Sequence, residues 1–199
     1  MVPRPSFLAT PADMARMLTS QAYLAGQLTR REVAQRYRTT VLGALWTVLQ
    51  PLFMLAVFTF VFGFVMKARW PGLAAEDGPS GLQFASLLFS GLLLHGFLAE
   101  CLGQAPGLVV GHVNYVKRLI FPLEVLALPL VGSALVHLLV GLAILGVFIV
   151  IAFGGLPPTA LLVPVVLAPF LVLMTGLVWL LAALGVFFRD IGQVIGVIV

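Results

Sequence analysis

The fold of this 199-residue chain is decided by residues 125–188, which read VLALPLVGSALVHLLVGLAILGVFIVIAFGGLPPTALLVPVVLAPFLVLMTGLVWLLAALGVFF. None of these residues carries a formal charge. A membrane-crossing helix needs about 20 apolar residues, so the stretch is too long for one crossing and long enough for two. The strongest break inside it is GGLPPT at 154–159. We therefore predict two membrane-spanning helices, at 125–153 and 159–188.

Two more charge-free runs precede this stretch. Residues 39–66 lie between Arg38 and Lys67, and residues 78–99 lie between Asp77 and Glu100. Each is long enough to cross the hydrocarbon core of a bilayer. The following stretch, QAPGLVVGHVNYVKR at 104–118, contains Pro, Gly, His and Asn, and we interpret it as a short interfacial element. The last residues, IGQVIGVIV, are apolar but too short to cross, so we expect the chain to stop inside a fifth span.

The composition agrees with an all-α, polytopic membrane protein. Hydrophobic residues make up 61% of the chain and charged residues 9%, against about 25% charged in a typical soluble domain. The mean hydropathy is +1.14. These values exclude a soluble enzyme and a disordered chain. The single cysteine, Cys101, excludes an internal disulfide and a cysteine-cluster metal site.

The basic residues predict the orientation of the spans. Cytoplasmic segments of membrane proteins carry an excess of Lys and Arg. With a cytoplasmic N-terminus, the inner side holds Arg4, Arg16, Arg30, Arg31, Arg36, Arg38, Lys117, Arg118 and Arg189. The outer side then holds only Lys67 and Arg69 among the basic residues, with Glu76 and Asp77. The first span lacks a small-residue cleavage site at its end, so we expect it to remain in the membrane as an anchor.

The N-terminal residues 1–38 are predicted to form a cytoplasmic, interfacial segment distinct from the transmembrane domain at 39–199. Thr10-Pro11-Ala12-Asp13 has the pattern of a helix start. Thr29-Arg30-Arg31-Glu32 has the capping-box pattern of a second start, with Leu28 and Val33 placed as a hydrophobic staple. We expect a basic amphipathic helix that lies in the interface before the first span.

Sequence motifs for catalysis are absent. The chain has no P-loop, no H-E-x-x-H and no G-x-S-x-G. We therefore expect no enzyme activity and no cofactor in this chain. His95, His112 and His137 fall on different segments, and we interpret each as a hydrogen-bonded packing residue. Spans one, three and four contain no charge, which argues against a proton-coupled transporter, so the energy for any transport is expected to come from a partner.

Three segments together resemble the ABC-2 type permeases that export polysaccharides such as O-antigen, capsule and teichoic acid. They are REVAQRYRTTVLGALWTVLQP at 31–51, FLAECLGQAPGLVVGHVNYVKRLIFPLEVLALP at 97–129 and FFRDI at 187–191. In the second segment the family shows an Asn, a basic pair, Phe-Pro, an acid and a further Pro in this order. The matching residues are Asn114, Lys117, Arg118, Phe121, Pro122, Glu124 and Pro129. Family members usually have six spans, so the resemblance implies that this chain is incomplete at its C-terminus.

The resemblance implies a homodimeric permease that works with two ABC ATPase subunits, which hold the ATP and Mg. The loop between spans two and three is then the coupling element that docks on the ATPase. Its residues are Asn114, Tyr115, Lys117, Arg118, Phe121, Pro122 and Glu124. The alternative is that the basic pair only fixes the topology. Arg189 and Asp190 match the cytoplasmic loop after span four.

The substrate implied by the resemblance is a glycan on a lipid-diphosphate carrier. Arginines can bind phosphate oxygens in a bidentate manner, so a substrate entrance is predicted at Arg30, Arg31, Arg36, Tyr37 and Arg38. These arginines would otherwise only anchor the helix on anionic membrane lipid. A glycan path is predicted along one face of span one, at Trp46, Phe53, Phe60 and Phe64. That face would otherwise contact lipid or a neighbouring helix.

Three other functions remain open at this point. A permease for a drug or a lipid would share the fold. A non-transporting membrane scaffold or regulator would share the composition. An intramembrane enzyme is the third, although the sequence offers no catalytic set for it. No nucleic-acid partner is expected.

Overall fold

The computed structural model describes residues 22–37, 42–66, 80–111, 126–188 and 190–199. Within these ranges the chain is helical and contains no β-strand. The α-helices are α2 (Ala22–Tyr37), α3 (Trp46–Phe58), α4 (Ser80–Gln104), α5 (Leu108–Gly111), α7 (Ala127–Phe153), α8 (Val163–Phe187) and α9 (Ile191–Ile198). Short 3-10 helices lie at η1 (Gly43–Leu45), η3 (Ala105–Gly107) and η5 (Pro158–Leu162), and η2 (Thr59–Val65) is a π-helix.

Among the described residues, four helical segments are long and apolar enough to cross a membrane, as the sequence predicts. They are Trp46–Val65, Gly81–Gly111, Ala127–Phe153 and Pro158–Phe187. The third and fourth lie within two residues of their predicted ends. The first begins at Trp46, later than predicted, because residues 42–45 form a turn and a 3-10 helix. The second extends well past its predicted end at residue 99.

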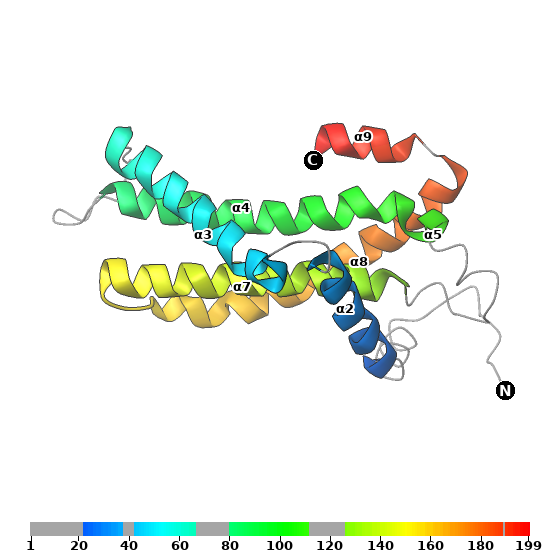
Figure 1. Ribbon diagram of the computed structural model, residues 1–199, viewed down its shortest axis with the longest axis horizontal. Helices are drawn as coiled ribbons and strands as arrows, with labels where there is room; N and C mark the ends of the chain where they lie inside the picture. Colours follow the sequence, from blue (N-terminus) through cyan, green and yellow to red (C-terminus); the bar gives the residue numbers. More distant parts are fainter. Residues whose placement is uncertain (1–21, 38–41, 67–79, 112–125, 189) are drawn as a thin grey trace.

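The spanning helices form an elongated bundle (Figure 1). α4, α7 and α8 run along its long axis, and α3 crosses obliquely over one half of it. α2 projects from the side of the bundle beside α7, and α9 turns back next to α4. α9 consists of the apolar residues that the sequence analysis assigns to the start of a fifth span.

The tight turn between α7 and α8 has a local cause. Gly154, at the C-terminal end of α7, has a φ of 76°, which L-residues with a side chain rarely adopt. Its N–H donates to the Val150 carbonyl at 2.9 Å. Pro157 and Pro158 follow and prevent α7 from continuing. The predicted break at GGLPPT is therefore confirmed.

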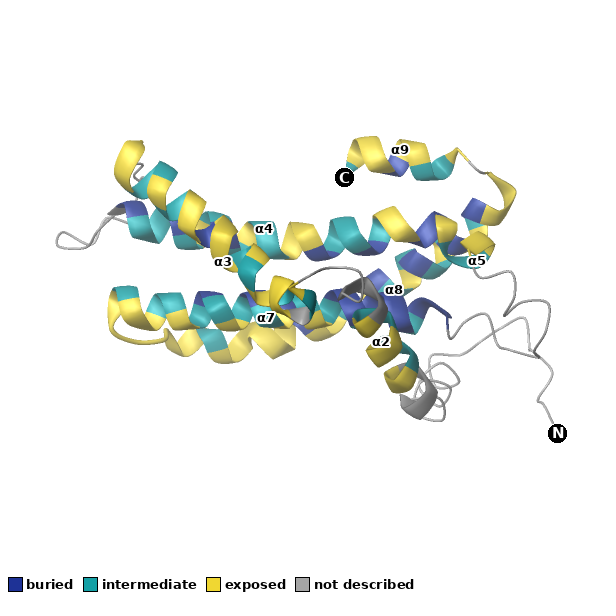
Figure 2. Ribbon diagram, viewed as in Figure 1, coloured by how far each residue is buried: buried dark blue, intermediate teal, exposed yellow. Residues whose placement is uncertain are grey.

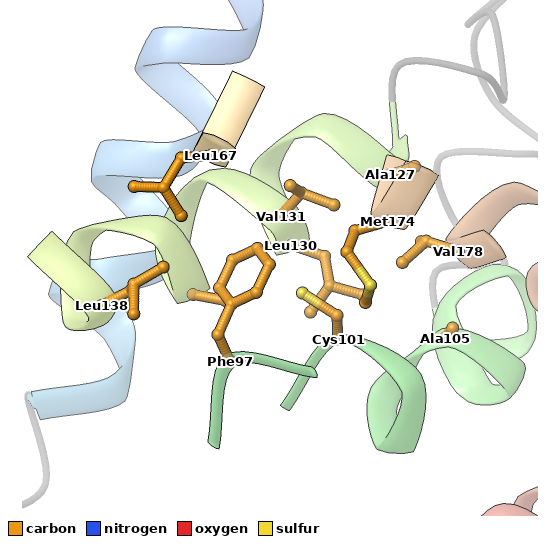
Figure 3. Packing of buried hydrophobic residues seen from close by; sticks show 11 residues of the cluster. Phe97, Cys101, Ala105, Ala127, Leu130, Val131, Leu138, Leu167, Met174 and Val178 are labelled. Atoms are coloured by element: carbon orange, nitrogen blue, oxygen red, sulfur yellow. The ribbon is translucent and has the colours of Figure 1, made fainter. Parts of the chain in front are cut away.

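The core lies between α4, α7 and α8 (Figure 3). Phe97 and Cys101 of α4 point toward Leu130 and Val131 of α7, with Met174 of α8 beside them. Large apolar side chains on the outer faces of the helices are exposed (Figure 2). Such faces are what a helix surrounded by lipid presents, because the acyl chains are as apolar as the side chains.

Close backbone contact fixes one end of this core. A Cβ added to Gly185 of α8 would lie 2.7 Å from the Cα of Pro106 in η3, so only glycine fits there. Small residues at such positions let membrane helices approach closely. The end of α8 is thereby held against the segment that leads into residues 112–125.

α2 differs from its prediction. It runs unbroken from Ala22 to Tyr37, so the predicted second helix start at Thr29 is wrong. Its interior residues favour helix and a single threonine is tolerated there. Its apolar residues are spread around the helix and do not form one stripe, so this part of the segment is not amphipathic. Thr29 instead packs against Gly132 of α7. The helix start predicted at Thr10 lies outside the described residues, and the boundary at residue 38 stays a prediction.

Candidate functional site

A cavity of about 350 Å³ lies between α3, α4 and α7. Five polar residues line it: Thr47 and Gln50 from α3, His95 and Glu100 from α4, and His137 from α7. The remaining lining is mostly apolar. A cavity with a largely apolar wall and a few convergent polar groups is the usual form of a small-molecule binding site. Polar side chains from three spanning helices meet here.

Glu100 and His137 form an interaction between two spanning helices. His137 Nδ1 lies 3.2 Å from Glu100 Oε2, at hydrogen-bond distance. Both side chains are mostly buried, with 20% of His137 and 15% of Glu100 exposed. His137 lies about 15 Å from the start of α7, a helix about 40 Å long. Glu100 lies about 28 Å from Gly81 along α4 and about 6 Å from the end of α4 at Gln104, after which η3 and α5 extend the span to Gly111. The pair therefore lies within the spanning segments.

The position of Glu100 corrects a sequence prediction. We used this glutamate as the boundary of the second span, because a charge commonly ends an apolar run. α4 continues through Cys101 to Gln104, and η3 and α5 extend the span to Gly111. Residues 104–111 of the predicted interfacial element at 104–118 therefore belong to this span. The glutamate is accommodated because His137 meets it across the helix interface.

The pair is also a candidate functional feature that sequence reasoning missed. The sequence predicts His137 as a hydrogen-bonded packing residue, and its hydrogen bond is confirmed, but it also lines the cavity. An ionisable residue inside a membrane span is a candidate functional group by default. The available signal was that the sequence after Glu100, CLGQAPGLVVG, is apolar enough to extend the span.

One face of α3 is turned toward the cavity. Thr47, Pro51 and Met54 follow at intervals of four and three residues, which places them on one side of an α-helix, and Gln50 lies beside them. Because these residues are in the first two and a half turns of α3, the cavity lies near the start of this helix. The N-terminal part of α3 thus contributes polar side chains to a site that it shares with α4 and α7.

The predicted aromatic face of span one lies elsewhere on the same helix. Trp46, Phe53, Phe60 and Phe64 are all exposed, with Phe53 and Phe60 at 61% and Phe64 at 70%. None of them is among the residues that line this cavity. The last two rings lie on the π-helix η2, with centroids 6.4 Å apart. The face is rotated from the cavity side of α3 by about a third of a turn.

The predicted entrance residues fall partly within the description. Arg30 and Arg31 lie in the middle of α2, and both are exposed. Arg36 and Tyr37 belong to the last turn of α2, but their side chains are not among those that the structure describes. Arg38 lies outside the described residues. The site therefore stays a prediction.

The predicted coupling residues Asn114, Tyr115, Lys117, Arg118, Phe121, Pro122 and Glu124 all lie outside the described residues, as does Arg189. The described chain flanks this segment on both sides. α5 ends at Gly111, and α7 begins at Ala127. Asp190 is exposed and directly precedes α9.

Comparison with known proteins places the chain in a family. The profile of the ABC-2 type transporter family matches residues 23–199. The chain is similar to the O-antigen export system permease protein RfbA of Myxococcus xanthus, with 28% identity over 169 residues, which covers 84% of this chain and 60% of the relative. It is also similar to the protein of the same name from Klebsiella pneumoniae, with 23% identity over 166 residues, 82% of this chain and 60% of the relative. The chain thus spans about 60% of the length of these curated relatives.

Proposed function

The chain belongs to the ABC-2 type transporter family, and we propose that it is the membrane-spanning permease subunit of an ABC exporter that moves a lipid-linked polysaccharide across the bacterial inner membrane. The observation that carries this proposal is the family match over nearly the whole chain, joined to relatives named for O-antigen export. The four apolar spans supply the multi-pass membrane domain that such a subunit requires.

The energy for export comes from a separate ATPase subunit in this proposal. The sequence contains no P-loop, and so the ATP and Mg are held by the partner. Residues 112–125, with the basic pair Lys117 and Arg118, dock on that partner. The contact between Gly185 and Pro106 supports this role, because it holds η3, which precedes the docking segment in the chain, close against α8. Motion of the ATPase would then be transmitted to the bundle.

The orientation follows from the basic residues. The N-terminus and residues 112–125 face the cytoplasm, and the turn at 154–159 faces outward.

Two copies of the chain form the permease. The aromatic face of α3, made of Trp46, Phe53, Phe60 and Phe64, supplies a path along which sugar rings stack and slide. Its exposure in the single chain leaves these rings available to a glycan.

The lipid-diphosphate group enters beside α2. Arg30 and Arg31 are exposed on this helix, and Arg36, Tyr37 and Arg38 follow them toward the first span. A charge-assisted hydrogen bond contributes about 1.5–3 kcal/mol, so the loss of one weakens capture by about ten- to a hundredfold. Plain attraction to anionic lipid contributes about 1 kcal/mol per residue, and lysine serves it equally well.

The test is polysaccharide export by the gene product that carries this sequence. It is expressed with its cognate ATPase in a host that lacks its own polysaccharide exporter, and surface polysaccharide is measured at matched membrane abundance. We expect export that depends on the ATPase. An ATPase-dependent complex that transports a drug or a phospholipid and leaves the polysaccharide inside would contradict the proposal.

A second measurement tests the entrance. Arg36→Lys and Arg38→Lys keep the charge but lose the two-pronged contact with phosphate. We expect both variants to export less polysaccharide than the wild type. Arg4→Lys, far from the predicted entrance in sequence, is the matched control. Wild-type export in both entrance variants would leave only membrane anchoring for these residues.

A further inference from the structure

The cavity between α3, α4 and α7 brings polar side chains together inside the membrane-spanning bundle. Glu100 and His137 contact each other across two helices, and Thr47, Gln50 and His95 line the same space. Polar groups at this depth are costly to place among apolar side chains, and they commonly mark a binding site or a pathway. We propose that this cavity is a binding subsite for an uncharged, hydroxyl-rich group, namely one sugar unit of the transported glycan. The identification of the sugar as part of a glycan rests on the proposed function.

The charges of the lining select against an anion. Glu100 is a carboxylate, and no Lys or Arg is found among the described residues that line the cavity. A phosphate group placed there would lie beside the acidic Glu100, and the described lining offers it no Lys or Arg. The diphosphate of the carrier therefore does not fit this cavity.

A metal ion is not favoured either. The described residues contain no group of three or more His, Cys, Asp or Glu side chains that could hold one. Zinc and similar ions in proteins require three or four such ligands. The pair of Glu100 and His137 alone does not reach that number.

The hydrogen-bonding capacity of the lining suits hydroxyl groups. A hydroxyl both donates and accepts, and so it needs partners of both kinds. The carboxylate of Glu100 accepts, and the amide of Gln50 and the hydroxyl of Thr47 do both. Because His137 holds Glu100 in place at 3.2 Å, the carboxylate is oriented before a ligand arrives. Such preorganisation lowers the entropic cost of binding.

The size and walls of the cavity suit a single sugar ring. Its volume of about 350 Å³ is near the lower end of the range for small-molecule sites, which is about 300–1,000 Å³. Phe89, Phe97 and Met54 are among the apolar side chains of its wall. A sugar ring has an apolar face and a polar rim, and the lining offers both apolar and polar side chains.

The test is protection of a cysteine placed in the cavity. Gln50→Cys is introduced into the gene product, which is assembled with its ATPase in lipid nanodiscs, and the rate of maleimide labelling is measured. The native Cys101 is fully buried in the core and does not compete for the reagent. The probes are decyl glucoside and decyl phosphate, which share a chain length and differ in the headgroup. Val48→Cys, on an exposed side of the same turn of α3, is the matched control.

We expect decyl glucoside alone to slow the labelling of Gln50→Cys. When its concentration is three times the Kd, the labelling rate falls about fourfold, because the unoccupied fraction is 1/(1+[L]/Kd). Labelling of Val48→Cys does not change. Equal protection by both probes would mean that only the alkyl chain occupies the cavity, and protection by decyl phosphate alone would mean an anion site. Either result, or no protection at all, overturns the proposal.

Two further arms keep the result interpretable. Thr47→Cys reports on the same cavity if Gln50→Cys does not assemble. Export of polysaccharide by the wild type is measured separately. Export without protection by glucoside would reject the subsite and keep the proposed function. Protection by glucoside in a complex that exports no polysaccharide would reject the proposed function and keep a sugar site.

Discussion

Two faces of α3, separated by about a third of a turn, differ in chemistry and in how they are built. The aromatic face, made of Trp46, Phe53, Phe60 and Phe64, is exposed and belongs to one helix. The cavity face, made of Thr47, Gln50, Pro51 and Met54, forms one wall of a partly open site that it shares with α4 and α7. A run of large rings on an outer surface can contact many ligands weakly. A polar cavity shared by three helices can hold one group in one orientation, so the two faces predict different responses to mutation.

The largest effect is expected from filling the cavity. Gln50→Trp places an indole ring where a ligand group would bind, and we expect polysaccharide export to fall more than tenfold, equivalent to more than about 1.4 kcal/mol. Export and ATPase activity are measured at matched membrane abundance. Val48→Trp adds the same ring on an exposed side of the same turn and should retain at least half of the export. Equal losses in both variants would mean that a bulky residue in this turn, and not the cavity, is the cause.

The sequence predicts the spans well because they depend on local patterns, and the aromatic face is a prediction of the same local kind. Charge-free runs between Arg38 and Lys67 or after Glu124 mark the spans without any knowledge of neighbouring helices. GGLPPT ends α7 and separates it from α8, because of the backbone preferences of glycine and proline. The seven-residue spacing of Trp46, Phe53 and Phe60 is also a local pattern, and it predicts that these rings lie on one side of a helix.

The cavity could not be predicted because it depends on which helices meet. Glu100 and His137 are 37 residues apart, and neither belongs to a motif. A charge at the end of an apolar run suggests the end of a span, but α4 continues past Glu100, which contacts His137 of α7. The packing of Thr29 on Gly132 likewise depends on the position of α7.

A smaller effect is expected on the aromatic face. Phe53→Leu removes one ring from a path with several, and a stacked ring contributes about 1 kcal/mol, so export should fall about fivefold. Phe53→Tyr keeps the ring and serves as the matched control, with export within about twofold of the wild type. Surface polysaccharide is measured for both. Unchanged export after Phe53→Leu and Phe60→Leu together would assign this face to lipid.

The interaction between Glu100 and His137 should contribute modestly to stability. A double-mutant cycle with Glu100→Ala and His137→Ala measures the coupling free energy of the pair. We expect about 0.6–1.7 kcal/mol for an interhelical hydrogen bond in a membrane protein. The readout is the free energy of unfolding in a bilayer. The control cycle pairs Glu100→Ala with Thr175→Ala, because Thr175 bonds to Leu171 of its own helix and should show no coupling. A coupling of zero between Glu100 and His137 would mean that the contact does not stabilise the bundle.

The smallest effect is expected from the hydroxyl of Thr47, and it separates hydrogen bonding from shape in the cavity. Thr47→Val keeps the size and branching of the side chain and removes the hydroxyl. Thr47→Ser keeps the hydroxyl and removes a methyl group. A neutral hydrogen bond contributes about 0.5–1.5 kcal/mol, so the valine variant should bind decyl glucoside about two- to tenfold more weakly. The serine variant should bind it nearly as well as the wild type. Affinity is measured by protection of Gln50→Cys in each background. The reverse order, with serine weaker than valine, would mean that the methyl group and not the hydroxyl contacts the ligand, and the cavity would then distinguish ligands by shape alone.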